Sequence, residues 1–126
     1  MDFQTMAVAA VMVAAVPAMM TTSAMATQVA ISISIPVTGE TGVNSTSAAY
    51  DCAGRAVTAT YVNAGEVSLA VLDIDGETVV ASNVLAASGA RYAGGRYVWW
   101  TKGDEADLYD LMDGGDDKPV AHCLAR

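Results

Sequence analysis

Two cysteines, Cys52 and Cys123, limit the folds open to this chain more than any other feature of its sequence. They are the only cysteines, and they stand near the two ends of the part that has the pattern of a folded domain. A bond between them would close a loop of about 70 residues and stabilise the domain by about 4 kcal/mol in the chain-entropy model. That is a large share of the stability of a small domain. A disulfide requires an oxidising compartment, so the question is whether the N-terminal segment directs export from the cytoplasm.

The N-terminal segment has the pattern of an export signal. Residues 6–20, MAVAAVMVAAVPAMM, form an uncharged apolar run, and Ala24-Met25-Ala26 follows as an A-x-A site with cleavage after Ala26. The run is shorter than the roughly 20 residues that a membrane-spanning helix needs. The residues ahead of it carry Asp2 and no Lys or Arg, so the signal is atypical or the start is misplaced. An uncleaved anchor and a buried helix are the alternatives, but we expect export.

Export favours a disulfide between Cys52 and Cys123, because exported domains with an even, minimal number of cysteines usually pair them. The alternative is a reactive pair of Cys123 and His122, but neighbours in a strand point to opposite faces. No cysteine lies near the expected cleavage site. We therefore expect neither a lipid anchor there nor a stable membrane span after cleavage.

The chain divides into three expected segments: a signal peptide at 1–26, a flexible leader at 27–48 and one folded domain at 49–126. Residues 29–35 of the leader alternate Val or Ile with small residues, which is a strand period, and Pro36 ends the alternation. A stretch rich in Gly, Ser and Thr follows. The pattern leaves open whether residues 29–35 add a strand to the domain.

From Tyr50 onward the pattern is that of an all-β domain. The expected strands include residues 57–61, 67–74, 77–85, 96–101, 105–112 and 120–124. Asp75-Gly76 predicts a hairpin turn, residues 86–95 a loop rich in small residues, and residues 113–117 an acidic turn. About seven or eight short strands without a convincing helix predict a small antiparallel β-barrel, with a sandwich as the alternative. The disulfide would join the first strand to the last.

Composition and residue pattern exclude several kinds of function. Six Lys and Arg against fourteen Asp and Glu, a net charge of −8, cannot neutralise a row of phosphates, which excludes nucleic acid as a partner. His122 is the only histidine, and no acidic turn has the ligand count of a calcium loop, so we expect no metal and no cofactor. A pair of catalytic carboxylates needs a cleft for which so small a domain has little room. We expect a protein that is not an enzyme.

Aromatic and basic side chains gather in one short stretch: Arg91, Tyr92, Arg96, Tyr97, Trp99, Trp100 and Lys102. Tyr, Trp and Arg dominate the energetic centres of binding surfaces. Strand alternation places Tyr97 and Trp99 on one face and Trp100 on the other, so one Trp should be in the core and one nearer the surface. The stretch therefore indicates a binding surface.

This stretch also resembles a known family. Residues 88–92, SGARY, and 97–106, YVWWTKGDEA, bracketed by the two cysteines, resemble the inhibitors of C-type lysozyme found in bacterial envelopes. That family has lipoprotein members and soluble periplasmic members, and the resemblance covers residues 49–123. Because no cysteine directly follows the signal peptide, the chain is more similar to the soluble periplasmic members, which implies a periplasmic location in a Gram-negative envelope.

The resemblance implies a compact barrel with one disulfide, whose two loops enter the active-site cleft of C-type lysozyme and block its catalytic carboxylates, protecting the cell wall. The residues implied to bind lysozyme are Ser88, Gly89, Tyr92, Lys102 and Gly103, with supporting contacts from Arg91, Tyr97 and Trp99. Such lysozymes are basic, which suits an acidic partner. The alternative is a periplasmic polysaccharide-binding module using Tyr92, Tyr97 and an exposed Trp.

Overall fold

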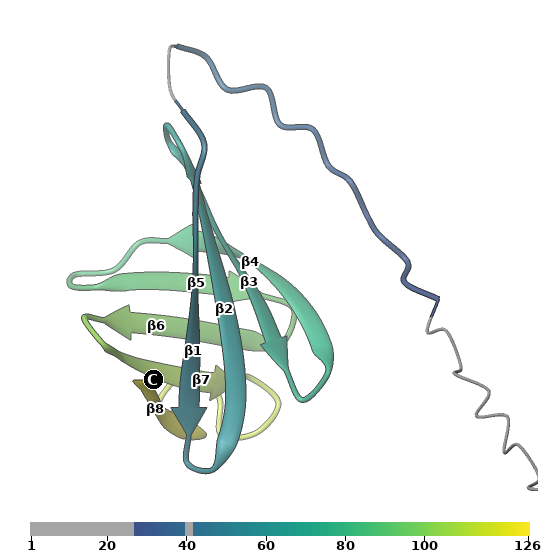
Figure 1. Ribbon diagram of the computed structural model, residues 1–126. Helices are drawn as coiled ribbons and strands as arrows, with labels where there is room; N and C mark the ends of the chain where they lie inside the picture. Colours follow the sequence, from purple (N-terminus) through teal and green to yellow (C-terminus); the bar gives the residue numbers. More distant parts are fainter. Residues whose placement is uncertain (1–26, 40–41) are drawn as a thin grey trace, which may run out of the picture. The chain divides into compact units, whose positions relative to one another are not determined.

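The computed structural model describes residues 27–39 and 42–126 and shows a closed barrel of eight antiparallel strands (Figure 1). The strands are β1 (Asn44–Cys52), β2 (Arg55–Ala64), β3 (Val67–Ile74), β4 (Glu77–Val84), β5 (Ala90–Gly94), β6 (Tyr97–Lys102), β7 (Glu105–Asp110) and β8 (Ala121–Ala125). Each strand pairs with its neighbours in the sequence, and β8 returns to pair with β1. Over these two ranges the chain has no helix that could cross a membrane. The predicted small antiparallel barrel is confirmed.

The β3–β4 hairpin follows the sequence prediction closely. Strand β3 has the predicted bounds, and Asp75 and Gly76 form the turn with φ of 52° and 79°. Positive φ at both central residues twists a two-residue turn in the same sense as the strands it joins. Local turn chemistry was therefore sufficient to place this hairpin.

The loop predicted for residues 86–95 was wrong, because most of its second half is strand β5. Small residues there reflect close packing between strands. A Cβ on Gly94 would collide with the carbonyl oxygen of Val80 and lie 2.8 Å from the Cα of Ala81, both in β4. The neighbouring backbone of β4 thus excludes any side chain at position 94. Composition alone does not distinguish a glycine required by such close packing from a glycine in a loop.

The N-terminal boundary of the barrel also differs from the prediction. Strand β1 begins at Asn44, ahead of the expected start at residue 49, and pairs with β2 from Asn44 opposite Asn63. Its first six residues, NSTSAA, lack large apolar side chains, so the ladder to β2 rather than an apolar pattern defines them. Residues 27–38 carry no strand, including the alternating segment 29–35. The expected signal peptide, 1–26, lies outside the described residues.

The barrel core is centred on Trp99, whose side chain is fully buried. Its ring meets Tyr50 edge-on, with ring centroids 5.0 Å apart, and its Nε1 donates to the hydroxyl of Tyr61 at 2.8 Å. The Tyr61 hydroxyl shares a second hydrogen bond of 3.0 Å with that of Tyr50. Burial raises the pKa of Tyr61, with the bond to Tyr50 adding to the effect. The only polar atom of the core indole is thereby satisfied, as a buried donor must be.

The predicted disulfide is confirmed between Cys52 and Cys123, which lie directly opposite each other in β1 and β8. Only three residue pairs join these two strands. The covalent bond therefore supports a short seam, where the first and last strands close the barrel.

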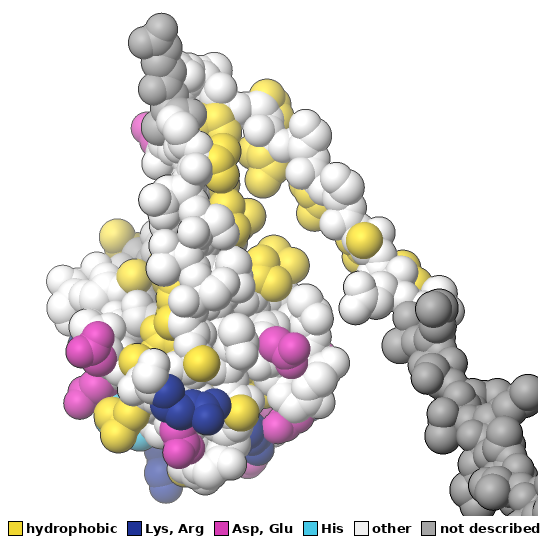
Figure 2. All heavy atoms as spheres, viewed as in Figure 1, with side chains coloured by type: hydrophobic (Ala, Val, Ile, Leu, Met, Phe, Trp, Pro, Cys, Tyr) yellow, Lys and Arg dark blue, Asp and Glu magenta, His cyan; other side chains and the backbone are white. Residues whose placement is uncertain are grey.

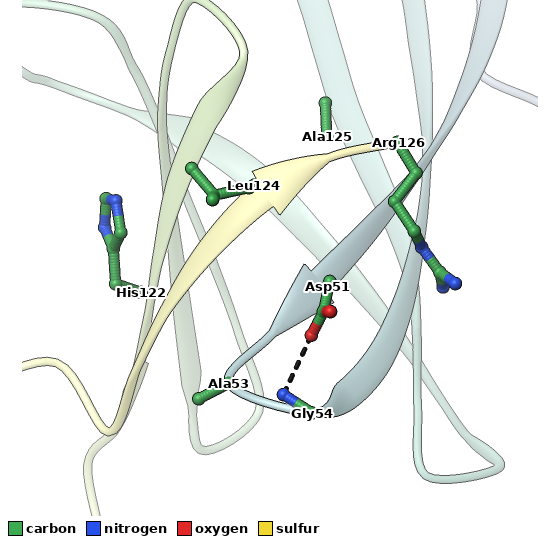
Figure 3. A pocket seen from close by; sticks show the side chains of 7 residues that line it. All are labelled: Asp51, Ala53, Gly54, His122, Leu124, Ala125 and Arg126. Carbon is green, nitrogen blue, oxygen red and sulfur yellow. Dashed lines mark hydrogen bonds between the residues drawn. The ribbon is translucent and has the colours of Figure 1, made fainter.

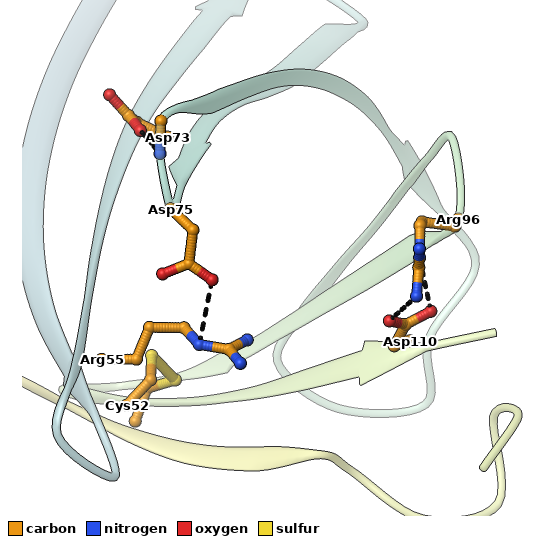
Figure 4. A network of polar contacts seen from close by, with 8 residues as sticks. Cys52, Arg55, Asp73, Asp75, Arg96 and Asp110 are labelled. Carbon is orange, nitrogen blue, oxygen red and sulfur yellow. Dashed lines mark hydrogen bonds and ion pairs between the residues drawn. A yellow bond between two sulfur atoms is a disulfide. The ribbon is translucent and has the colours of Figure 1, made fainter. Parts of the chain in front are cut away.

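An ion pair between the exposed side chain of Arg96, just before β6, and the buried carboxylate of Asp110, at the end of β7, joins these two strands. Arg96 donates two hydrogen bonds to the carboxylate of Asp110, one of them from Nε to Oδ1 at 2.8 Å (Figure 4). The backbone N–H of Met112 donates to the same carboxylate at 3.0 Å. The hydrogen bond from Arg96 is the main cause of a lowered pKa at Asp110. Asp110 is thus occupied in holding the barrel together and is not a free acidic group.

Candidate functional site: two adjacent loops at one end of the barrel

Ser88 lies in a connection that is longer than most of those between the strands of the barrel. Five of the seven connections between strands are two-residue turns, whereas β4 and β5 are joined by residues 85–89. This loop stands clear of the barrel, since Leu85 at its start is 97% exposed. Ser88 and Gly89 are therefore carried on one of the two connections long enough to project.

Lys102 stands at the end of strand β6, immediately before a tight turn. Gly103 opens this turn with a φ of 58°, a conformation that glycine adopts without steric cost, and β7 begins at Glu105. Lys102 is exposed. The turn leaves the lysine side chain at the rim, where it is free to meet a partner.

The β4–β5 loop and the β6–β7 turn lie side by side at one end of the barrel (Figure 1). In the β5–β6 ladder Ala90 lies opposite Thr101, so Gly89 and Lys102 follow as neighbours at the rim. A Cβ on Gly89 would collide with the carbonyl oxygen of Thr101 and lie 2.7 Å from Cγ of Lys102. Ser88, Gly89, Lys102 and Gly103 are thus brought together. We call these four residues the loop edge.

Trp100 belongs to the aromatic stretch but not to the residues implied by the family resemblance to bind lysozyme, and it connects both halves of the loop edge. Its Nε1 donates to the backbone carbonyl of Ser88 at 2.8 Å, and Nζ of Lys102 lies 4.6 Å from its ring centroid. The guanidinium of Arg91, opposite Trp100 in the ladder, lies 5.6 Å from the same centroid. The available signal was strand alternation, which puts residues two apart, such as Trp100 and Lys102, on the same face.

Two of the predicted contact residues are buried and do not reach the surface. Trp99 is fully buried, and Tyr92 is 5% exposed, with its ring 5.7 Å from that of Tyr61. The expectation that Trp99 makes a supporting contact is therefore wrong. The rings of Trp99 and Tyr92 point into the core, because inward and outward positions alternate along β5 and β6. Tyr92 can support the loop edge from beneath, but it cannot stack on a sugar as the polysaccharide alternative requires.

Tyr97 lies at the opposite end of β6 from Lys102. It is half-buried against the core, opposite Gly94 of β5, and the guanidinium of Arg96 lies 5.5 Å from its ring centroid. The structure therefore does not bring Tyr97 to the loop edge. Arg91, in contrast, lies near the loop edge, because its guanidinium contacts the ring of Trp100.

A polar cluster on β7 and β8 borders the loop edge. Nδ1 of His122 lies 2.7 Å from Oδ1 of Asp107, and its Nε2 lies 3.9 Å from a carboxylate oxygen of Glu105. The hydrogen bond to Asp107 is the main cause of a raised pKa at His122. Within residues 27–39 and 42–126, no three His, Cys, Asp or Glu side chains are placed to hold a metal ion.

A separate hollow of about 420 Å³ lies between the β1–β2 turn and β8 (Figure 3). It is lined by Asp51, Ala53, Gly54, His122, Leu124, Ala125 and Arg126. Neither Ser88 nor Lys102 contributes to it. The loop edge is a projection, which suits a protein that fills the cleft of a partner better than one that encloses a substrate.

Charges of both signs are mixed on the barrel. On the face drawn in Figure 2, Lys and Arg side chains lie among Asp and Glu side chains over the lower part of the domain. The net charge of −8 is thus spread over the chain rather than collected into one acidic face on this side. An exposed lysine at the loop edge is therefore a local positive feature of an acidic protein.

Comparison with known proteins gives consistent matches. Residues 50–117 match the family model described as membrane-bound lysozyme-inhibitor of c-type lysozyme. A Pseudomonas aeruginosa protein named membrane-bound lysozyme inhibitor of C-type lysozyme is 46% identical over 90 residues, covering 70% of this chain and 71% of the relative. A Cupriavidus necator protein of the same name is 47% identical over 79 residues, covering 61% and 63%.

A solved structure is also similar. The crystal structure of Pseudomonas aeruginosa MliC in complex with hen egg white lysozyme matches with a TM-score of 0.62 and 40% sequence identity. The match covers 79% of this chain and all of the MliC chain. Sequence and backbone therefore agree over the barrel.

Proposed function

The chain belongs to the family of membrane-bound lysozyme inhibitors of C-type lysozyme, and from this we infer that it inhibits C-type lysozyme and is not an enzyme. The family match spans the barrel, and a relative of the same fold is known in complex with a C-type lysozyme. The observation within this chain that supports the inference is the adjacency of the β4–β5 loop and the β6–β7 turn. Gly89 packs so closely on Thr101 and Lys102 that the loop and the turn form one projection.

The proposed mechanism is occupation of the lysozyme cleft by the loop edge. Lysozyme cleaves a glycosidic bond with a general-acid glutamate and a second, ionised carboxylate. The ammonium of Lys102 would pair with one carboxylate, and the hydroxyl of Ser88 would donate a hydrogen bond near the other. Both catalytic groups would then be engaged and the sugar excluded, without any reaction by the inhibitor.

Burial of a lysine against a carboxylate is favourable only when water is excluded and the remaining donors are satisfied. Trp100 and the aliphatic stem of Lys102 provide apolar surface around the ammonium, since Nζ lies 4.6 Å from the indole centroid. Leu85 adds exposed apolar area on the same loop as Ser88. Contacts of this kind seal the centre of tight interfaces.

We further propose that the protein acts in the periplasm after export. The proposal rests on the apolar N-terminal run and the A-x-A site, together with the disulfide, which requires an oxidising compartment. The curated relatives are named membrane-bound. Intact-mass measurement of the protein recovered from the cell envelope tests both points: cleavage after Ala26 without added lipid is expected, and a lipid adduct would contradict it.

The function is tested by adding the purified protein to a cell-wall suspension during lysis by a C-type lysozyme. We expect loss of lysis at a stoichiometric ratio, and full lysozyme activity at a large excess of the protein would contradict the proposal. Lys102→Ala should weaken inhibition by about thirtyfold to a thousandfold, because truncating one partner of a buried charge pair costs about 2–4 kcal/mol. Ser88→Ala should have a smaller effect.

The chain offers a matched control for the lysine. Lys118, its only other lysine, is exposed in the connection between β7 and β8. Lys118→Ala removes the same charge from outside the loop edge, and inhibition should be unchanged. Equal losses in the two variants would show that net charge, and not the position of Lys102, determines inhibition.

A further inference from the structure

We propose that Trp100 is the positioning residue of the inhibitor, holding Ser88 and Lys102 at a fixed separation before lysozyme is bound. The inference rests on the proposed function. It concerns a side chain that does not itself need to enter the cleft.

The geometry places one indole between the two halves of the loop edge. Trp100 lies on β6 two residues before Lys102, so both side chains project from the same outer face. Its Nε1 donates to the carbonyl of Ser88 at 2.8 Å, and Ser88 lies in the loop that leads into the neighbouring strand β5. This bond fixes the backbone of the residue whose hydroxyl is assigned to the cleft.

The same ring orients the lysine. Nζ of Lys102 lies 4.6 Å from the ring centroid, within the range of an attractive cation–π contact. A free lysine samples many rotamers and loses that freedom on binding, whereas a lysine already held over a ring loses less. The position of the ammonium is therefore prepared in the free protein.

Neighbouring residues hold the indole itself in place. Arg91 lies opposite Trp100 in β5, with its guanidinium 5.6 Å from the ring, and Asp107 lies opposite it in β7. Trp100 is only half-buried, while Trp99 beside it is fully buried in the core. The two tryptophans thus have separate roles: Trp99 packs the barrel and Trp100 arranges its edge.

A double-mutant cycle tests whether Trp100 acts through Lys102. Trp100→Leu removes both the indole N–H and the ring, and we expect inhibition to weaken about tenfold. In a Lys102→Ala background the same change should weaken it only about threefold, because the hold on Ser88 is then the only one left to lose. In a Lys118→Ala background the full effect should remain. Equal effects in all three backgrounds would overturn the proposal, since they would indicate direct contact or a general loss of structure.

Trp100→Phe keeps a ring beneath Lys102 but removes the donor to Ser88. We expect intermediate inhibition with an unchanged midpoint of thermal unfolding, and this variant remains informative should the leucine variant fold poorly. Inhibition by the phenylalanine variant equal to that of the wild type would contradict the assigned hold on Ser88 and overturn the proposal.

A measurement without lysozyme separates this inference from the proposed function. The Lys102 Hε protons should show an upfield ring-current shift in the NMR spectrum of the free protein, and Trp100→Leu should abolish it. An unshifted Lys102 would overturn the positioning role even in an active inhibitor. Absence of inhibition by a wild-type protein with shifted Lys102 protons would instead reject the proposed function alone.

Discussion

The barrel core and the loop edge differ in what their residues stabilise, although adjacent positions of one strand serve both. Trp99 donates to Tyr61 inside the barrel, and Trp100 donates to Ser88 on the surface. The first hydrogen bond connects β6 to β2 across the interior, and the second connects β6 to a loop. Changes in the core should therefore lower stability, whereas changes at the loop edge should lower inhibition and leave the fold intact.

The strongest test of the core side is removal of the disulfide. Replacing both cysteines, Cys52→Ser with Cys123→Ser, should lower the free energy of unfolding by about 4 kcal/mol, because a long loop in the unfolded chain is no longer closed. Denaturant unfolding followed by Trp fluorescence measures the change. The fraction that remains folded should still inhibit lysozyme. A folded double variant without inhibition would show that the seam also shapes the loop edge.

A smaller loss of stability is expected from Tyr61→Phe. The change leaves the buried N–H of Trp99 and the hydroxyl of Tyr50 without their shared partner, which costs about 1–3 kcal/mol. Thermal unfolding by circular dichroism provides the measurement. Tyr97→Phe serves as the control, because its hydroxyl has no hydrogen bond within the described part of the chain. Equal shifts in both variants would contradict the role of the Tyr61 hydroxyl.

Gly89→Ala tests the contact between the two regions. The new methyl group would collide with the carbonyl of Thr101, and a φ of 65° adds strain, so the loop must move away from Lys102. We expect about tenfold weaker inhibition and a loss of stability of roughly 1 kcal/mol. Gly95→Ala carries similar strain, with a φ of 55° and open space around the new atom. It should lose no more stability than Gly89→Ala, because no neighbouring atom is displaced, and it should keep full inhibition.

The smallest expected effect concerns His122. Its pKa is raised because its ring donates to Asp107, so the protonated form is favoured in the folded state. This contribution to stability is complete below the usual pKa of about 6.5 and is lost as the pH rises through the raised value. Asp107→Asn should return the pKa toward its usual value in an NMR titration. The stability difference between variant and wild type should shrink above neutral pH, and a constant difference would contradict this assignment.

Part of the site could be predicted from the sequence because it depends on local order. Alternation along β6 was enough to put one tryptophan in the core and the other outside, and the residues drawn from the SGARY and KG segments lie side by side in the structure. The same alternation did not show that Trp99 was the buried one. The link from Trp100 to Ser88 was missed, since it joins a strand to a loop twelve residues earlier in the sequence.

The sequence by itself determined the all-β class, the Asp75-Gly76 hairpin and the family of the chain, because periodicity, turn chemistry and motifs are carried by neighbouring residues. Only the tertiary structure decided that residues 90–94 form a strand, that β1 begins at Asn44 and that Gly89 packs on Lys102. These features depend on register and on backbone contacts between strands. A strand lacking large apolar residues has no pattern of its own, and its partner in the ladder supplies the hydrogen bonds that define it.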